Sequence, residues 1–167
     1  MTKKQRLGFG FVVMVNTPLK NKPGSRKKTK TIQYLEQLSS LTNRKKKSAR
    51  LTRNSKIIKT IIAAIQEKKG EYILSLDLRK IKEAVADFFI ICEATSQPQV
   101  RAIAENVENR VREKCSEGPY HHEGYQKLHW VLIDYVNVVV HVMQQETRKF
   151  YRLEEMWSDA EGEEHKG

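Results

Sequence analysis

Three aspartates of this chain are candidates for catalytic chemistry. Asp77, Asp87 and Asp134 each end or flank a segment that predicts a β-strand. Carboxylates in such places can hold two metal ions in a polymerase-like fold. That chemistry would also need a Gly-Ser pair followed by two acids two residues apart on one strand, and that combined pattern is not present. The aspartates therefore do not favour an enzyme, and we expect no cofactor.

The sequence His121-His122-Glu123 invites a metal-site interpretation. The side chains of adjacent residues point apart, so two neighbouring histidines are poorly placed to bind one ion, and no partner cluster is evident in the sequence. We interpret the segment as a polar turn, with room for a short edge strand, and expect no metal. Ser96 could be a nucleophile, but no base is placed for it, and a helix cap explains it better.

The densest apolar block in the chain, LHWVLIDYVNVVVHVM at residues 128–143, contains an unexpected set of polar residues. We predict two adjacent strands joined at a two-residue tip, Val136-Asn137. One face is then wholly apolar and should be core; it pairs Tyr135 with Val138, Ile133 with Val140, and Val131 with Val142. The other face is mixed; it pairs Trp130 with Met143, Leu132 with His141, and Asp134 with Val139.

A face that mixes large apolar groups with an acid and an imidazole suits a protein–protein contact. We therefore expect the mixed face of residues 128–143 to be the working surface. The alternative is that a helix covers this face and that His141 is a core histidine with its hydrogen bonds satisfied.

The elements that must position this hairpin follow from hydrophobic periodicity and turn residues. Asn54 or Ser55 can cap a helix that ends before Gly70, which suits the left-handed position after it. The predicted order is helix, strand, strand, helix, hairpin and helix, at residues 55–69, 71–78, 88–92, 95–117, 128–143 and 144–160. The last helix has four apolar anchors, Phe150, Leu153, Met156 and Trp157. The pattern predicts an α/β fold with a single mixed sheet and flanking helices, and residues 161–167 as a frayed tail.

The net charge of +11 is concentrated in the N-terminal third of the chain. Residues 1–54 carry 15 Lys and Arg against one acid, whereas residues 55–167 carry 16 against 19. The body is thus mildly acidic and would not bind phosphates by bulk electrostatics, whereas the arm could. The composition of residues 1–54 predicts a largely disordered basic arm.

The basic arm has two interpretations. Either it is a solvated tail or the product of an overlong translation start, or it is an arm that contacts RNA. The candidates for RNA contact are the cations of its last basic run: Arg44, Lys45, Lys46, Lys47 and Arg50.

The remaining composition indicates a cytoplasmic protein. Cys92 and Cys115 have no metal-site spacing and are expected to be free thiols in a reducing compartment. No apolar run approaches the ~20 residues of a membrane span. Residues 7–15 are too short and glycine-containing for a signal peptide, and no small-residue cleavage site follows.

Several separate motifs occur in an order that resembles one known family. They are ADFFIICEATSQPQVRAIAENVE (86–108), HEG (122–124), HWVLIDYVNVVVHVM (129–143) and QETRKFYRLEEMW (145–157). In this order they resemble the ribosomal silencing factor family, also called the Iojap-like family, over residues 55–160. Residues 1–54 lie outside the resemblance.

The resemblance implies a nucleotidyltransferase-like α/β fold without established catalysis. It implies binding to the large ribosomal subunit through its fourteenth ribosomal protein, on the face that meets the small subunit. Occupation of that face would block subunit joining and repress translation when nutrients are scarce. It also implies a homodimer away from the ribosome, while organelle relatives assist large-subunit assembly. The alternatives are an assembly factor that binds rRNA through the basic arm, and a nucleotidyltransferase-type enzyme.

Family positions that matter for binding carry over onto six residues: Trp130, Leu132, Asp134, Tyr135, Val139 and His141. The chain departs from the family at Val136, where glycine is usual. A tip with positive φ disfavours a β-branched residue, so we expect a wider or differently twisted turn. It also has Ala94-Thr95-Ser96 where Gly-Asn-Ser is common, which weakens a phosphate-binding interpretation of that loop.

Overall fold

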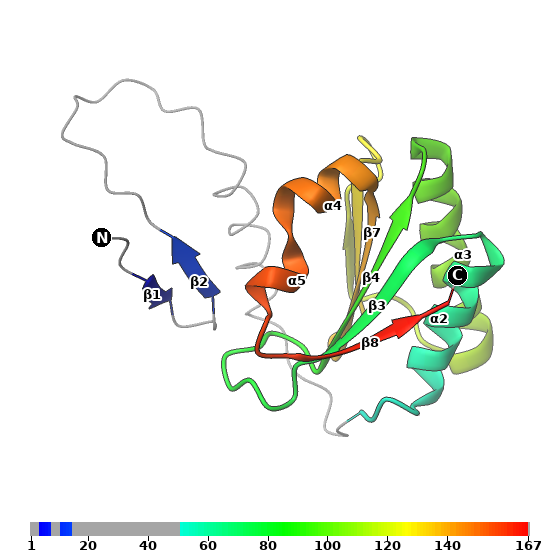
Figure 1. Cartoon of the computed structure of the whole chain (residues 1–167). Coiled ribbons are helices and arrows are strands. Elements are labelled where there is room, and N and C mark those ends of the chain that lie inside the picture. Colours follow the sequence, from blue (N-terminus) through cyan, green and yellow to red (C-terminus); the bar gives the residue numbers. More distant parts are fainter. Residues whose placement is uncertain (1–3, 8–10, 15–50, 167) are drawn as a thin grey trace.

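The computed structural model describes residues 4–7, 11–14 and 51–166 (Figure 1). Within the N-terminal arm, strands β1 (Lys4–Leu7) and β2 (Phe11–Met14) pair antiparallel. The prediction of disorder is therefore wrong for these two segments. The aromatic and β-branched residues of β2 (FVVM) favour extended backbone, whereas β1 (KQRL) has no such residue. The five candidate RNA-contact residues, Arg44, Lys45, Lys46, Lys47 and Arg50, lie outside the described residues.

The body is one mixed sheet, as predicted, and it has six strands. Its strand order is β5-β6-β7-β4-β3-β8. The central pair, β4 and β7, is parallel, and the other neighbours pair antiparallel. The strands are β3 (Glu71–Asp77), β4 (Phe88–Ala94), β5 (His121–Glu123), β6 (Trp130–Asp134), β7 (Val138–Gln144) and β8 (Glu161–His165).

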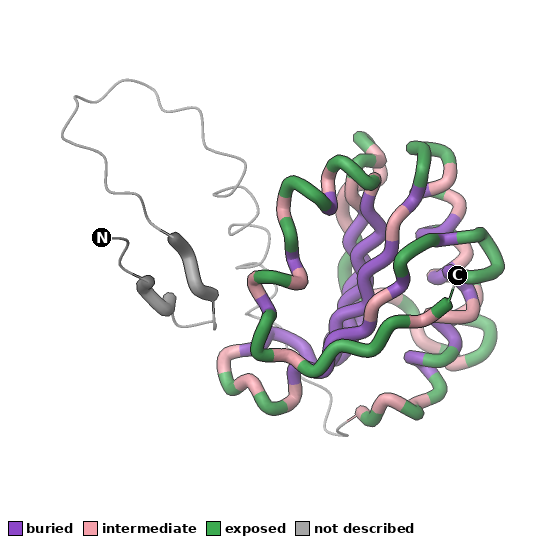
Figure 2. The backbone as a smooth tube through the Cα atoms, in the orientation of Figure 1, coloured by how far each residue is buried: buried purple, intermediate pink, exposed green. Residues whose placement is uncertain are grey.

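Helices cover both faces of this sheet (Figure 1). Helices α2 (Lys56–Glu67) and α3 (Gln97–Cys115) lie on one face, and α4 (Gln145–Tyr151) and α5 (Leu153–Met156) lie on the other. Each face has its own hydrophobic core. Residues Phe88 to Cys92 of β4 are all buried, as the continuous apolar run FFIIC predicts for a strand covered on both faces. Figure 2 shows the same concentration of buried residues in the central strands. The likeness to nucleotidyltransferases stays a prediction.

The two helices of the first face begin at the predicted caps but end differently. Ser55 is the residue before α2, but its side chain makes no capping hydrogen bond, whereas Ser96 caps α3 by accepting a hydrogen bond from the Gln99 backbone N–H. The left-handed position after α2 is taken by Lys69 (φ 55°), not by Gly70. Gly70 is required for another reason, because a Cβ there would lie 2.4 Å from Cγ2 of Ile65.

The first two residues of β3 depart from strand alternation, which predicts Tyr72 on the same face as Leu74 and Leu76. The register shifts between Glu71 and Leu74, where the strand bulges. Tyr72 takes a positive φ of 46° and is 68% exposed instead of joining the core face. A bulge of this kind re-aims one side chain and bends the strand.

The C-terminal segment is not a frayed tail. β8 (Glu161–His165) pairs antiparallel with β3 from Asp77 to Ile73, although its own residues are mostly exposed (Figure 2). Hydrogen bonds from Arg53 to the carboxylates of Glu161 and Glu163 tie the strand to the start of the body. Hydrophobic periodicity does not predict this strand, because its sequence is acidic and polar. An edge strand depends on backbone pairing more than on apolar burial.

The last predicted helix is broken in two. Arg152 adopts a left-handed conformation (φ 46°) between α4 and α5. Leu153 and Trp157 are buried as predicted, but Phe150 is 63% exposed and is not a core anchor. Cys92 and Cys115 are free thiols, as expected. Among the described residues, no helix has the length and apolar character to cross a membrane.

Candidate docking surface

The β6–β7 hairpin has the predicted register. Trp130 pairs with Met143, Leu132 with His141, and Asp134 with Val139, and the intervening pairs match as well. The Tyr135 N–H donates to the Val138 carbonyl at 2.8 Å, which closes the two-residue tip. The expectation of a wider tip is therefore wrong.

The tip accommodates Val136 through tertiary contacts. Val136 has a φ of 72°, and the Asn137 N–H donates back to the Tyr135 carbonyl at 2.9 Å. A three-residue turn of this hand is rare and strained. The Val136 N–H donates to Asp134 Oδ1 at 2.7 Å, and the Asn137 amide donates to Asp87 Oδ2 at 3.0 Å. The Asn137 carbonyl also accepts the backbone N–H groups of Asp87 and Phe88, so the entry to β4 holds the turn in place.

The mixed face of the hairpin is covered by α4 and α5, as in the alternative interpretation, although His141 Nε2 has no hydrogen-bond partner among the described residues. Leu132 is 7% exposed, and Asp134, Val139 and His141 are fully buried on this side. Tyr135 is only 2% exposed, on the opposite face. The expectation of an open mixed face is therefore wrong, because Leu153 and Trp157 pack over it. Of the six candidate binding residues, only Trp130 is partly exposed.

His141 is a neutral core histidine that contacts Trp130. The Trp130 indole N–H donates to His141 Nδ1 at 3.3 Å. The edge of the Phe89 ring packs against the imidazole, with centroids 4.8 Å apart. Burial lowers the pKa of His141 to about 3, so the side chain is uncharged at neutral pH.

Trp130 is the inner end of a row of aromatic rings that leads to the surface. Its ring centroid lies 5.1 Å from that of Tyr151, which lies 5.0 Å from that of Phe150. We call Trp130, Tyr151 and Phe150 the aromatic row. Exposed aromatic groups beside a rigid sheet are typical anchors of protein interfaces.

Sequence reasoning missed the outer part of the aromatic row. It placed Phe150 in the core, since the spacing of Phe150, Leu153 and Trp157 fits one helical stripe. The left-handed residue Arg152 interrupts that stripe and turns Phe150 outward. No signal in the sequence marks an arginine for this conformation.

The aspartates considered for metal chemistry have structural partners. Asp77 binds Arg79 bidentately, with a shortest contact of 2.6 Å, and these hydrogen bonds hold its pKa below the usual range. Asp87 and Asp134 accept hydrogen bonds at the hairpin tip. Within residues 51–166, no three His, Cys, Asp or Glu side chains are grouped to hold a metal ion.

The two histidines of β5 point to opposite sides of the sheet edge, as predicted. His121 contacts Glu123 at 2.7 Å, and His122 contacts Glu108 of α3 at 2.9 Å. The segment is the short edge strand that the sequence left room for. Both histidines are exposed, so each contact lies on the rim of the sheet.

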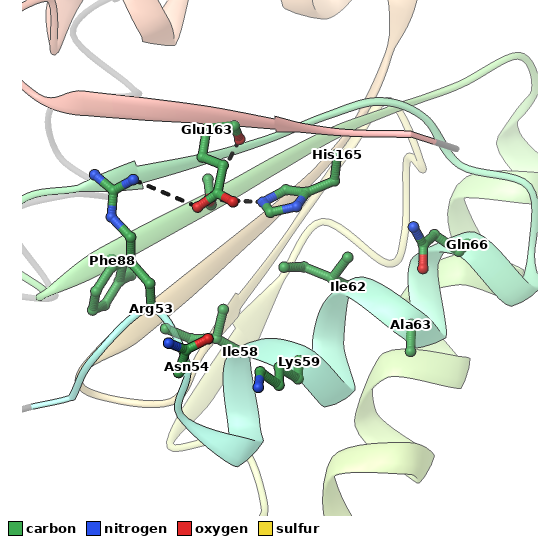
Figure 3. Close-up of a pocket in the computed structure, with 11 residues that line it drawn as sticks. Arg53, Asn54, Ile58, Lys59, Ile62, Ala63, Gln66, Phe88, Glu163 and His165 are labelled. Carbon is green, nitrogen blue, oxygen red and sulfur yellow. Dashed lines mark hydrogen bonds and ion pairs between the residues drawn. The ribbon is translucent and has the colours of Figure 1, made fainter.

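A separate cleft of about 260 Å³ lies between α2 and β8. In Figure 3, Ile58 and Ile62 of α2 face Glu163 and His165 of β8 across it. The polar groups of its upper wall are paired with each other, Arg53 with Glu163 and Ser75 Oγ with His165 Nε2 at 2.9 Å. This arrangement fastens β8 to the sheet, and none of the six candidate binding residues lines it.

Comparisons with known proteins agree on one family. A family model described as "Ribosomal silencing factor during starvation" matches residues 51–166. Ribosomal silencing factor RsfS of Bacillus subtilis is 40% identical over 104 residues, which cover 62% of this chain and 86% of that protein. RsfS of Halalkalibacterium halodurans is 38% identical over 107 residues, which cover 64% of this chain and 90% of that protein.

A solved structure has the same fold. The crystal structure of a Chromobacterium violaceum protein superimposes with a TM-score of 0.58 and 33% sequence identity, covering 61% of this chain and 83% of that one. The residues that the family model matches, 51–166, include the hairpin and the aromatic row. The family model spans more than half of the residues, and the chain belongs to the ribosomal silencing factor family.

Proposed function

We propose that this protein binds the large ribosomal subunit and blocks its association with the small subunit, which represses translation in the cytoplasm when nutrients are scarce. The fourteenth ribosomal protein of the large subunit, at the intersubunit face, is the proposed contact. The observation that carries the proposal is the family match over residues 51–166. The names of the bacterial relatives support the same class of regulatory protein rather than an enzyme.

The proposed docking surface is the aromatic row, with Trp130 as its anchor. Trp130 is the partly exposed member of the six positions taken from the family, and Phe150 extends it to the surface. Four of the other positions, Leu132, Asp134, Val139 and His141, are buried on the same face and support the surface from within, whereas Tyr135 is buried on the opposite face. Rigid aromatic side chains give large contact area with little entropy loss on binding.

The charge distribution supports different partners for the body and the arm. The body from residue 55 onward has a net charge of −3 and suits a basic protein partner. The arm has a net charge of +14, and we propose that it adds contacts to rRNA through its last basic run. Assistance in large-subunit assembly, with rRNA bound by the arm, is the second candidate function, and the arm's charge favours it. The resemblance also implies a homodimer of the free protein, which light scattering would test.

A direct test measures co-sedimentation of the full-length protein with purified large subunits, followed by a subunit-joining assay. We expect Trp130→Ala to weaken binding by about 2 kcal/mol, roughly 30-fold, and to restore joining. Tyr120→Ala is the matched control, because Tyr120 is 64% exposed and belongs to neither the aromatic row nor the six positions.

Two outcomes would contradict the proposal. Wild-type protein that neither binds large subunits nor slows joining would exclude the function. Equal binding by Trp130→Ala and Tyr120→Ala proteins would exclude the surface. Deletion of residues 1–50 separates the two candidates, since binding that survives it comes from the body, and binding that is lost favours RNA contact by the arm.

A further inference from the structure

The indole of Trp130 is hydrogen-bonded to a buried polar side chain. The indole Nε1 lies 3.3 Å from His141 Nδ1, and the two rings are 5.7 Å apart and tilted by 44°. An indole N–H can only donate a hydrogen bond, so Nδ1 must be the unprotonated nitrogen of a neutral imidazole. The imidazole proton is therefore on Nε2.

Packing alone does not explain a histidine at position 141. The side chain is fully buried, and its Nε2 has no hydrogen-bond partner among the described residues. A buried donor without a partner is costly, and an apolar side chain of similar size would avoid that cost. The feature that only the imidazole supplies here is the acceptor, Nδ1, which faces the indole of Trp130.

The surroundings of His141 hold its imidazole in a fixed position. It lies in the middle of β7, opposite Leu132 of β6, with the Phe89 ring against it. Leu132 and Phe89 are themselves buried, so the acceptor has a fixed place in the core. The donor of this hydrogen bond, the Trp130 indole, is partly exposed. It also contacts Tyr151, whose pKa is raised by burial.

We propose that His141 is a positioning residue, whose Nδ1 holds the Trp130 indole in the orientation that docks on the large ribosomal subunit. This inference rests on the proposed function and deepens it, because it identifies a buried residue that fixes the conformation of the docking side chain. A side chain that is already held in its bound rotamer loses less conformational entropy on binding. His141 thereby acts on affinity without touching the partner.

The first test uses the wild-type, full-length protein. Long-range ¹H–¹⁵N NMR correlations of the imidazole ring report which nitrogen carries the proton. We expect the tautomer protonated at Nε2, with Nδ1 as acceptor. The opposite tautomer, protonated at Nδ1, would overturn the proposal, because the indole would then have no acceptor.

The second test compares His141→Leu, which removes the acceptor, with His141→Gln, which can supply one through its amide oxygen. Solvent exchange of the Trp130 indole N–H is measured by NMR, with the Trp157 signal identified in a Trp157→Phe protein. Affinity for large subunits is measured on the same samples. We expect His141→Leu to expose the indole N–H to exchange and to weaken binding about tenfold, while His141→Gln stays within about threefold of wild type.

Three outcomes of the second test would overturn the proposal: an indole that stays protected in His141→Leu, unchanged affinity despite lost protection, or equal losses in both variants. If His141→Leu does not fold, the tautomer measurement decides alone. The proposed function fails separately, when Trp130→Ala leaves binding unchanged. If Trp130→Ala weakens binding and His141→Leu does not, only the positioning role is excluded.

Discussion

The buried histidine should make the stability of the fold depend on pH. Burial lowers the pKa of His141 from 6.5 to about 3, and its ring faces Trp130 and Phe89, neither of which titrates. Below pH 6.5 the unfolded chain binds a proton at this residue that the folded protein does not bind. The free energy of unfolding therefore falls as the pH falls from 6.5 towards 3, and His141 has no effect above that range.

The size of the effect follows from the two pKa values. With 6.5 in the unfolded chain and about 3 in the folded protein, linkage gives a loss of about 2 kcal/mol between pH 7 and pH 5. A domain of this size has a total stability of roughly 5–15 kcal/mol. The loss is therefore large enough to measure by denaturant unfolding.

The assay is urea unfolding of wild-type and His141→Leu proteins at pH 7 and pH 5. Wild type should lose about 2 kcal/mol more than the variant over this interval. His129→Leu is the control, because His129 is exposed, and this protein should keep the wild-type pH dependence. Identical pH dependence in wild type and His141→Leu would refute the reasoning, since it would mean that the folded protein protonates His141 as readily as the unfolded chain does.

Other perturbations test the packing of the body. Asp134→Ala should cost about 1–3 kcal/mol of stability, because it leaves the Val136 N–H without its acceptor; Asp134→Asn keeps an oxygen there and should cost less in the same urea titration. Gly70→Ala should cost about 1–3 kcal/mol through its clash with Ile65, whereas Gly118→Ala, with open space around it, should change stability by less than about 0.5 kcal/mol. Removal of residues 161–167 should lower the melting temperature, since it breaks the β8 pairing with β3 and the Ser75–His165 contact; an unchanged melting temperature would mean that β8 adds nothing to stability.

Local patterns determined most of the central architecture. The isoleucines between residues 57 and 65 recur at helical spacing, which predicts α2, and the continuous apolar run FFIIC predicts a strand buried on both faces. The hairpin register followed from counting, because a side-chain period of two leaves only one way to place the apolar face inward. These features depend on neighbouring residues, which a sequence displays directly.

Tertiary contacts decided the features that matter most for the proposed surface. Val136 takes a positive φ because Asp134, Asp87 and the entry of β4 hold the tip, and intrinsic preference would have opposed it. Arg152 breaks the last helix and turns Phe150 outward, although helical spacing assigned it to the core. β8 forms because β3 offers a free edge and Arg53 binds its carboxylates.

The mixed face of the hairpin shows most clearly which features the sequence alone cannot determine. The sequence by itself determined that Trp130, Asp134 and His141 share one face, since strand periodicity is a local property. It could not determine what covers that face, because coverage depends on where α4 and α5 fold back. Only the tertiary structure buried His141, left Trp130 partly exposed and joined the two by a hydrogen bond, since burial arises from residues distant in the chain.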